Sequence, residues 1–381
     1  KSYFVERNGS SMIAFHLPKK DFQGFHIVAS HSDSPTYRIK EQPEMSVEKH
    51  YTKLNIERYG GMIPETWFDR PLSVAGRIII EENGQIKDQL VNVDRDLMII
   101  PNLAIHMSRS SNESKQLNPQ KDLLPLCGGN LTKDGFEEMI AKEAGVEKED
   151  ILSYDLFLYN RMRGTTLGIN EEFVAAPKLD DLECAYSSIE GMLNAKLSKD
   201  YVTVCAVFDN EEVGSGTKQG AGSTFFPEVL KRISYLCGKN EEEYYMAVAD
   251  SFMLSADNAH AVHPNYQDKT DPTNRPYINE GIVLKYNASQ KYTTDANSAA
   301  LVKYLCKKEK IKCQVFFNRS DMLGGSTLGN ILTGQVSIKA ADIGLPQLSM
   351  HSTYETAGCK DLDDMITLMG SFYELGKEVQ I

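Results

Sequence analysis

Short apolar runs alternate with amphipathic stretches along most of this chain. Four runs read as buried strands: residues 25–30, 202–208, 246–249 and 345–350. They are continuous rather than alternating, which is typical of strands covered on both faces. Three stretches have helical spacing: residues 181–195, with Leu182, Tyr186, Ile189 and Leu193 on one stripe, 297–309 and 362–375. The pattern predicts an α/β fold.

Residues 41–172 follow a different pattern. Asn83-Gly84 separates GRIII from QIKDQLVNV, and an Asn-Gly pair between two such runs is a strong hairpin signal. One helix is expected near residues 136–144, where Gly145 can end it. We therefore expect a β-rich inserted domain over residues 41–172. The α/β domain would then be discontinuous, covering residues 1–40 and 173–381.

Composition excludes some classes of partner. The 381 residues carry 41 Lys+Arg against 53 Asp+Glu, a net charge of −12 that argues against nucleic acid or an anionic membrane surface. No apolar run approaches the roughly 18 residues of a membrane helix. Seven scattered cysteines without a CxxC pair indicate reduced thiols and a cytoplasmic protein. The chain opens on KSYFVERNGS without Met, so we expect an N-terminal piece to precede it, and export stays open.

Side chains that can bind metal follow all four apolar runs. They are His31 and Asp33 after the first run, Glu211 and Glu212 after the second, Asp257 after the third and His351 after the last. In open α/β sheets, ligands collect beyond the carboxyl ends of the strands. Imidazole and carboxylate groups suit a pair of divalent metals. Of two adjacent glutamates in a loop, one can bind metal while the other serves as general base, which is the chemistry of metal-assisted amide hydrolysis.

Each of these residues alone has a plainer explanation. An acidic residue after a strand often caps a helix, and Asp33 can be a turn residue before Ser-Pro. The spacing of His31 and Asp33 also allows Asp33 to lie behind His31 and fix its tautomer. Four runs that all end on such residues are hard to explain by capping alone.

Six motifs together resemble the aspartyl aminopeptidase family, in the family's order from residue 31 to 352. They are HSDSP, PKLDDL, FDNEEVGS, SADNAHAVHPNY, DMLGGSTLG and MHS. The resemblance implies a metallo-exopeptidase sheet flanked by helices, with the inserted domain used for dimerisation. It also implies a zinc-dependent aminopeptidase that releases N-terminal residues from short peptides, with two zinc ions per subunit, assembled as a homododecamer.

The resemblance also implies a role for each site residue. The implied metal ligands are His31 and Asp257 for one ion, Glu212 and His351 for the other, and Asp180 as the carboxylate bridging both. Glu211 would be the general base. Without the resemblance, Asp180 reads as the cap of the following helix, and we expect Asp181 to be that cap.

Further residues are candidates for contact with the substrate. The glycine-rich segment DMLGGSTLG lacks the Gly-Lys-Ser/Thr of a nucleotide site. Gly324 and Gly325 are instead expected to let the backbone approach the substrate closely, because glycine has no side chain. Asp321 is a candidate for holding the substrate's α-amine, or a turn residue. The resemblance implies that His106 reaches a neighbouring active site and stabilises the oxyanion there; the alternative is a buried interface histidine. We expect His260 and His263, near Asp257, to serve packing or hydrogen bonding.

The preferred N-terminal residue is left open by the sequence. Acidic-preferring relatives, as we align them, have Lys where this chain has Ser289. Lys291 is then either the substitute cation for an Asp or Glu side chain or a solvated surface charge. The alternatives are an aminopeptidase preferring neutral residues, a related amidohydrolase, and a non-catalytic shell protein. The last is disfavoured because every implied ligand and the base are present.

Overall fold

The computed structural model describes residues 1–18, 21–109, 116–130 and 134–378, and its contacts divide the chain into two compact units. The first unit comprises residues 1–34, 165–350 and 355–381, and the second comprises residues 35–164 and 351–354. The second unit thus begins at residue 35 and its main segment ends at residue 164, whereas the sequence analysis expects an inserted domain over residues 41–172. Strand β4 (Thr36–Val47) runs through the first expected boundary. Strands β10 (Thr165–Leu167) and β11 (Phe173–Ala176) pair with each other in a sheet of the first unit across the second.

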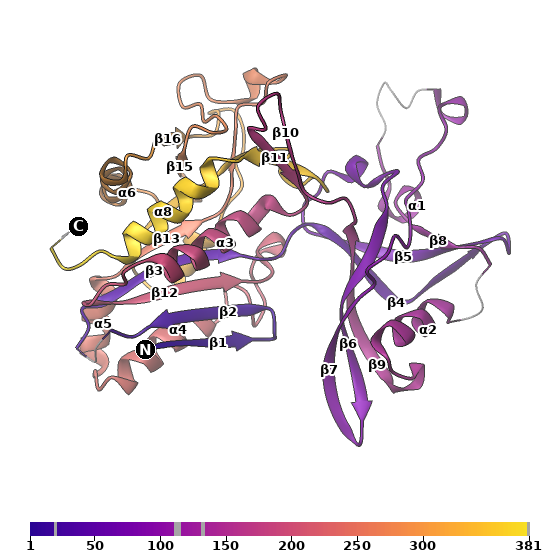
Figure 1. The fold of residues 1–381 in the computed structure, drawn as a ribbon, viewed down its shortest axis with the longest axis horizontal. Coiled ribbons are helices and arrows are strands. Elements are labelled where there is room, and N and C mark those ends of the chain that lie inside the picture. Colours follow the sequence, from indigo (N-terminus) through magenta and orange to yellow (C-terminus); the bar gives the residue numbers. More distant parts are fainter. Residues whose placement is uncertain (19–20, 110–115, 131–133, 379–381) are drawn as a thin grey trace. The chain divides into compact units, whose positions relative to one another are not determined.

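An eight-stranded sheet forms the centre of the first unit (Figure 1). In order across the sheet, its strands are β1 (Ser2–Arg7), β2 (Ser11–His16), β12 (Tyr201–Phe208), β3 (Gly24–His31), β13 (Phe252–Ala256), β17 (Lys339–Gly344), β15 (Ile282–Lys285) and β16 (Cys313–Phe316). The four neighbours β12, β3, β13 and β17 are parallel, so their carboxyl ends lie along one edge. The expected α/β fold is confirmed.

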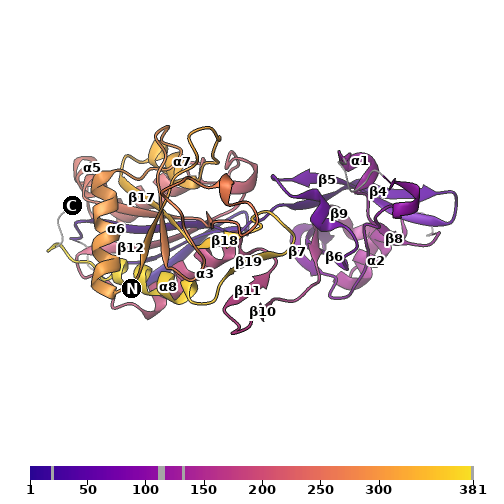
Figure 2. The ribbon, with the colours of Figure 1, turned by 90° about the horizontal axis from the view of Figure 1, so that it is seen from above.

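Helices cover both faces of this sheet (Figures 1 and 2). One face packs against α4 (Phe225–Leu236), α5 (Glu241–Ala249) and α7 (Leu328–Gln335), and the other against α3 (Leu179–Asn194), α6 (Ala296–Glu309) and α8 (Asp361–Tyr373). On β3, Ile27 belongs to the first core and Val28 to the second. Because successive side chains point to opposite faces, both must be apolar, which explains the continuous apolar runs.

A smaller five-stranded sheet completes the first unit. In order, its strands are β10, β11, β19 (Glu355–Gly358), β18 (Pro346–Leu348) and β14 (Ala259–His260). Short 3-10 turns lie at Glu211–Val213 and Gln267–Lys269. No helix in the described part of the chain is long and apolar enough to cross a membrane.

Two of the four predicted strands are wrong or misplaced. Residues 246–249 form the last turns of α5, which a capping box of Asn240 and Glu243 begins, and the strand is β13. Of residues 345–350, only Pro346–Leu348 is extended, and it belongs to the smaller sheet, while β17 takes the central place. Short apolar runs carry too little periodicity to separate a strand from a buried helix segment.

Helix α3 exposes three of the four residues of the predicted apolar stripe, while the fourth, Ile189, packs partly buried against the core. Leu182, Tyr186 and Leu193 of the predicted stripe are 41%, 51% and 72% exposed. Apart from Glu183, the buried residues of its central turns are small: Cys184, Ala185, Ser187, Ser188 and Gly191. A Cβ atom on Gly191 would lie 2.9 Å from the Cβ of Met369 in α8, so this close crossing excludes a larger residue. The apolar stripe therefore predicts the helix correctly but does not mark the side that the helix buries.

The second unit is built on a six-stranded sheet. Its order is β7 (Gln85–Asn92), β6 (Leu72–Glu82), β9 (Ile151–Asn160), β4, β5 (Tyr51–Tyr59) and β8 (Leu126–Gly128). The predicted hairpin is confirmed, with Asn83 and Gly84 at φ of 54° and 73°. So is α2 (Gly135–Ala144), which packs Phe136 and Ile140 into the core and ends at Gly145. The other helical segments in the described part of this unit are α1 (Pro119–Asp122) and 3-10 turns at Pro64–Trp67, Ile105–Met107 and Lys148–Asp150.

One histidine of the central sheet is buried without a charged partner. His26 of β3 stacks on the ring of Tyr201 at 4.0 Å, and its Nδ1 finds no hydrogen bond among the described residues. Burial lowers the pKa of His26 to about 3. In the unfolded chain the imidazole titrates near 6.5, so the unfolded state gains a proton first as the pH falls. Stability is therefore lost as the pH falls from about 6.5 towards 3.

We predict that His26→Phe removes this loss, because a phenyl ring keeps the stacking and cannot be protonated. Urea unfolding at pH 7.5 and 4.5 should show that the wild-type free energy of unfolding falls by about 2–3 kcal/mol more than that of the variant. His50→Phe, at an exposed position, is the control and should follow the wild type. Equal losses in His26→Phe and the wild type would contradict the prediction.

Candidate metal centre

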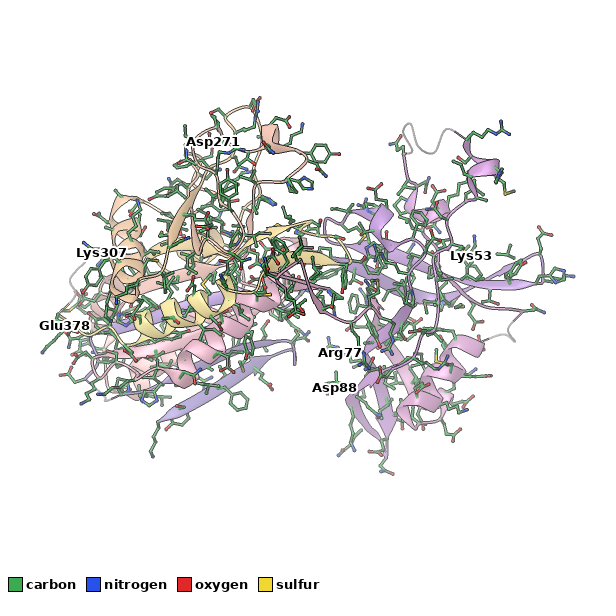
Figure 3. The ribbon with its side chains drawn as sticks, turned by 45° about the horizontal axis from the view of Figure 1, so that its top comes forward. Lys53, Arg77, Asp88, Asp271, Lys307 and Glu378 are labelled. Carbon is green, nitrogen blue, oxygen red and sulfur yellow. The ribbon has the colours of Figure 1, made fainter. Side chains whose placement is uncertain are left out.

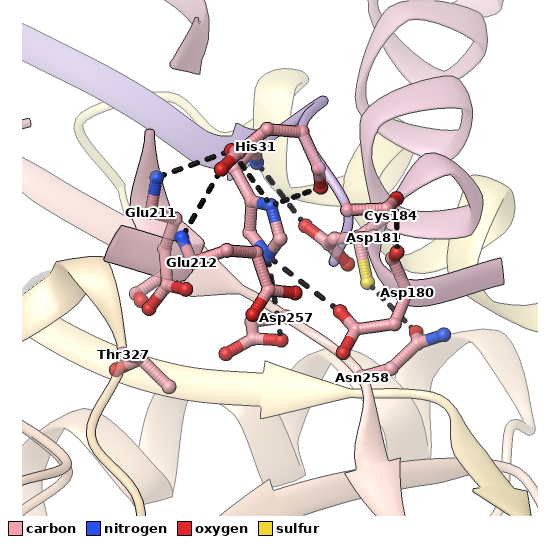
Figure 4. A network of polar contacts seen from close by, with 12 residues as sticks. His31, Asp180, Asp181, Cys184, Glu211, Glu212, Asp257, Asn258 and Thr327 are labelled. Carbon is pink, nitrogen blue, oxygen red and sulfur yellow. Dashed lines mark hydrogen bonds and ion pairs between the residues drawn. The ribbon is translucent and has the colours of Figure 1, made fainter. Parts of the chain in front are cut away.

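Three adjacent parallel strands bring His31, Glu212 and Asp257 to one edge of the central sheet, where the start of α3 adds Asp180 (Figure 4). His31 is the last residue of β3 and pairs in register with Phe208 of β12. The side chains around it form two overlapping groups, His31 with Asp180 and Glu212, and His31 with Asp181 and Asp257. Within each group the candidate ligand atoms all lie within 4.8 Å of one another.

The Nε2 atom of His31 faces two carboxylates. It lies 3.5 Å from Oδ1 of Asp180 and 3.9 Å from Oδ1 of Asp257. In a tetrahedral zinc site with bonds of about 2.0–2.2 Å, neighbouring ligand atoms lie about 3.3–3.6 Å apart. The spacing and the donor set, one imidazole with carboxylates, therefore fit zinc.

Asp33 connects two loops of the site. Its backbone oxygen lies 3.1 Å and its Oδ1 3.3 Å from Nδ1 of His31, so the structure places it behind this histidine. Its two carboxylate oxygens also accept the backbone N–H groups of Glu211 and Glu212, each at 3.1 Å. This second set of contacts is not foreseen from the sequence. It fixes the loop after β12 relative to the end of β3.

Asp181 does not cap α3. No side chain caps this helix, and neither Asp180 nor Asp181, which a cis peptide bond joins, has helical backbone angles. Oδ2 of Asp181 instead accepts the backbone N–H of His31 at 3.2 Å, and the side chain is fully buried. The cap prediction for Asp181 is wrong, and the doubled Asp of PKLDDL is the signal that could have found it.

Asp180 is held by residues that the sequence analysis did not single out. Its backbone N–H donates to Oε2 of Glu355 at 3.0 Å, and Oγ of Ser34 donates to its carbonyl at 2.9 Å. Glu355 accepts from Gln347, and Gln347 accepts from Asn258, the residue after Asp257. The chain of contacts connects the two ends of the acidic cluster.

Burial and like charges shift the ionisation of the site. Burial raises the pKa of Asp257, and burial together with the charges of Asp257 and Asp180 raises the pKa of Glu211 to about 7. Burial opposes protonation of His31, but the Asp180 and Asp33 carboxylates raise its pKa overall. These shifts show a surplus of negative charge, which a multivalent cation would offset.

Two predicted residues belong to the second unit. His351 opens the segment 351–354, and its carbonyl accepts the backbone N–H of Ile63 at 3.1 Å. His106 is exposed in the turn Ile105–Met107. The metal role of His351 and the catalytic role of His106 stay predictions.

Two of the four predicted substrate residues line a cavity of about 320 Å³ in the first unit. Gly324 and Gly325 line it, with His260 and His263 among the other lining residues. A Cβ atom on Gly324 would lie 2.2 Å from Oδ1 of Asn318, whereas nothing lies within 4 Å of one on Gly325. The close approach at Gly324 is therefore to this chain's own side chain, and Gly325 has open space.

Two charged candidates near this cavity have partners of their own. Lys291 donates to the carbonyl of Gly324 at 3.2 Å. Both oxygens of Asp321 accept from Arg319, at 2.9 and 2.8 Å, which lowers the pKa of Asp321 to about 2. The Asp321 carboxylate would have to leave Arg319, or share it, to hold a substrate amine.

Comparison with known proteins shows which family the chain belongs to. Residues 1–373 match the family model described as aminopeptidase I zinc metalloprotease (M18). The chain is 46% identical over 386 residues to a probable M18 family aminopeptidase 2 of Clostridium acetobutylicum, covering 98% of this chain and 88% of that relative. It is 38% identical over 379 residues to the protein of that name from Pseudomonas aeruginosa, covering 97% and 87%.

Solved structures agree with this result. The fold matches the cryo-EM structure of the Ape4 and Nbr1 complex with a TM-score of 0.94 and 37% identity, covering 98% of this chain and 76% of that one. It matches a dodecamer of S. cerevesiae mApe1 with a TM-score of 0.83 and 26% identity, covering 98% and 85%. The predicted resemblance is confirmed: the chain belongs to the M18 family and is a zinc-dependent aminopeptidase.

Proposed function

We propose that this aminopeptidase works with two divalent ions, most simply zinc, held by His31, Asp180, Glu212, Asp257 and His351. The observation that carries the proposal is the convergence of His31, Asp180, Glu212 and Asp257 at the carboxyl ends of β12, β3 and β13. When bound, two such ions lower the pKa of a water and polarise the scissile carbonyl of the substrate.

Glu211 is the general base in this proposal. Glu212 is close to His31 and Asp180, while Glu211 is the neighbouring residue of the same loop. Glu211 accepts the proton of the attacking water and returns it to the leaving amine. Asp33 holds the backbone of both glutamates and so sets where the base lies.

We further propose a cytoplasmic homododecamer. The solved mApe1 relative is a dodecamer, and the second unit exposes Ile86 and Leu90 on its outer strand β7, as a contact surface between subunits would. His106 would act from this unit on the oxyanion in a neighbouring subunit. The seven cysteines, all free, support a reducing compartment.

We propose that the preferred substrates are peptides with an N-terminal Asp or Glu, whose side chain would enter the cavity lined by Gly324. Lys291 lies against Gly324, whose backbone lines the cavity, so its ammonium is close to where a substrate side chain would enter. A carboxylate there would gain a charge-assisted hydrogen bond.

We predict that Glu211→Gln retains its metal but loses turnover by a factor of about 10² or more, because the amide cannot accept the proton. Metal content by mass spectrometry and kcat on a free-amine peptide give the two readouts. Glu228→Gln, on an exposed turn of α4, is the control. Turnover close to the wild-type rate in folded Glu211→Gln would rule out the assignment.

We predict that Asp33→Asn lowers kcat about 10–100-fold while the protein stays folded, since one N–H of the Glu211-Glu212 loop loses its acceptor. Asp271→Asn is a matched control, because Asp271 also accepts two backbone N–H groups, those of Thr273 and Asn274, on a loop elsewhere in the first unit (Figure 3). The role is excluded if both variants have the same kcat.

We predict that metal-loaded protein releases Asp and Glu faster than Leu or Met from peptides that differ only at the N-terminus, followed by mass spectrometry. Lys291→Met should cut this preference about tenfold or more, whereas Lys307→Met, exposed on α6 (Figure 3), should not. Faster release of Leu by the wild type would indicate a neutral preference instead. Acetylated peptides should stay intact, and their cleavage would indicate an amidohydrolase.

A further inference from the structure

Lys285 is a buried cation beside the acidic cluster. It is the last residue of β15, and only 2% of its surface is exposed. Its Nζ donates to the backbone oxygens of Asp257 at 2.7 Å and Asn258 at 3.2 Å. The ring of Tyr292 lies 5.2 Å from the same atom. Neither the motifs nor the proposed metal ligands include this lysine.

Burial of an ammonium group is costly unless the charge is paired and its N–H groups are bonded. A Met at this position would fill a similar volume without that cost. The charge of Lys285 is thus expensive for stability alone, and its hydrogen bonds and its ion pair within the described residues are with Asp257 and Asn258.

The two oxygens of the Asp257 carboxylate have different partners. Oδ1 faces the metal-binding group, 3.9 Å from Nε2 of His31. Oδ2 lies 3.5 Å from Nζ of Lys285. A carboxylate can bind a metal through one oxygen or through both, and here the second oxygen is directed to the lysine.

We propose that Lys285 is a positioning residue that limits Asp257 to one metal-binding oxygen and so keeps a coordination position open for substrate. This inference rests on the metal centre proposed above. Catalytic zinc sites keep such a position, and a second carboxylate oxygen would fill it and add negative charge to the ion. The backbone bonds to residues 257 and 258 keep the carboxylate at the required angle.

The test replaces Lys285 with Met and loads the protein with Co(II), whose visible absorption weakens as its coordination number rises. We expect the visible bands of Lys285→Met to lose intensity several-fold per bound ion, as Oδ2 joins the coordination. We also expect kcat to fall about 10–100-fold while KM changes little. Lys285→Arg, which keeps the charge, should recover most of the band intensity.

Lys308→Met is the matched control, because Lys308 donates to Oγ of Ser371 between α6 and α8, away from the site. It should keep the wild-type spectrum and kcat. The inference is overturned if Lys285→Met binds as much Co(II) as the wild type with an unchanged spectrum.

A second measurement does not depend on the folding of the variant. In a crystal structure of the metal-loaded wild type, Asp257 should bind through Oδ1 alone, with Oδ2 kept beside Lys285. Asp257 bound through both oxygens would overturn the inference. A folded wild type that binds no Co(II) would overturn the metal centre itself, whereas an unchanged spectrum in Lys285→Met would overturn only the role of the lysine.

Discussion

Mutual repulsion among buried carboxylates is the constraint that organises the first unit. Asp180, Asp181, Glu212 and Asp257 meet around a single imidazole, in a medium where like charges repel more strongly than in water. Hydrogen-bond donors and a cation of the same chain offset part of this repulsion. Backbone N–H groups approach Asp33 and Asp181, and an ammonium group approaches Asp257. A multivalent cation completes the compensation, so affinity for metal follows directly from the arrangement.

The central sheet supplies this arrangement because its strands are parallel. The carboxyl ends of β12, β3 and β13 lie side by side at one edge of the sheet, and each strand leads into a residue that can bind metal or accept a proton. Helix α3 also contributes to this arrangement, because the side that it buries carries mostly small residues. Small residues bring α3 close to the sheet and to α8, and its first turn thereby delivers Asp180 and Asp181 to the strand ends.

The parts of the site that follow β3 and β12 could be predicted from sequence, because those runs are long, apolar and directly followed by His31 and by Glu211-Glu212. Asp257 was found after a wrongly placed strand, since the MAVA segment of α5 has the same composition as a buried strand. Asp180 as a ligand came from the family motif. Glu355 and Lys285 could not be found, because their contacts join residues far apart in the chain and no local pattern marks them.

The distribution of the proposed metal ligands along the chain has a consequence during synthesis. The backbone of His31 bonds to a carboxylate 150 residues away, and Asp257 comes later still. Contacts of such large sequence separation form slowly, after the long loops between them have closed. A growing polypeptide therefore displays its first ligand to the cell well before the others exist. Ion capture must await a nearly finished chain, and from then on the captured ion stabilises the folded state by mass action.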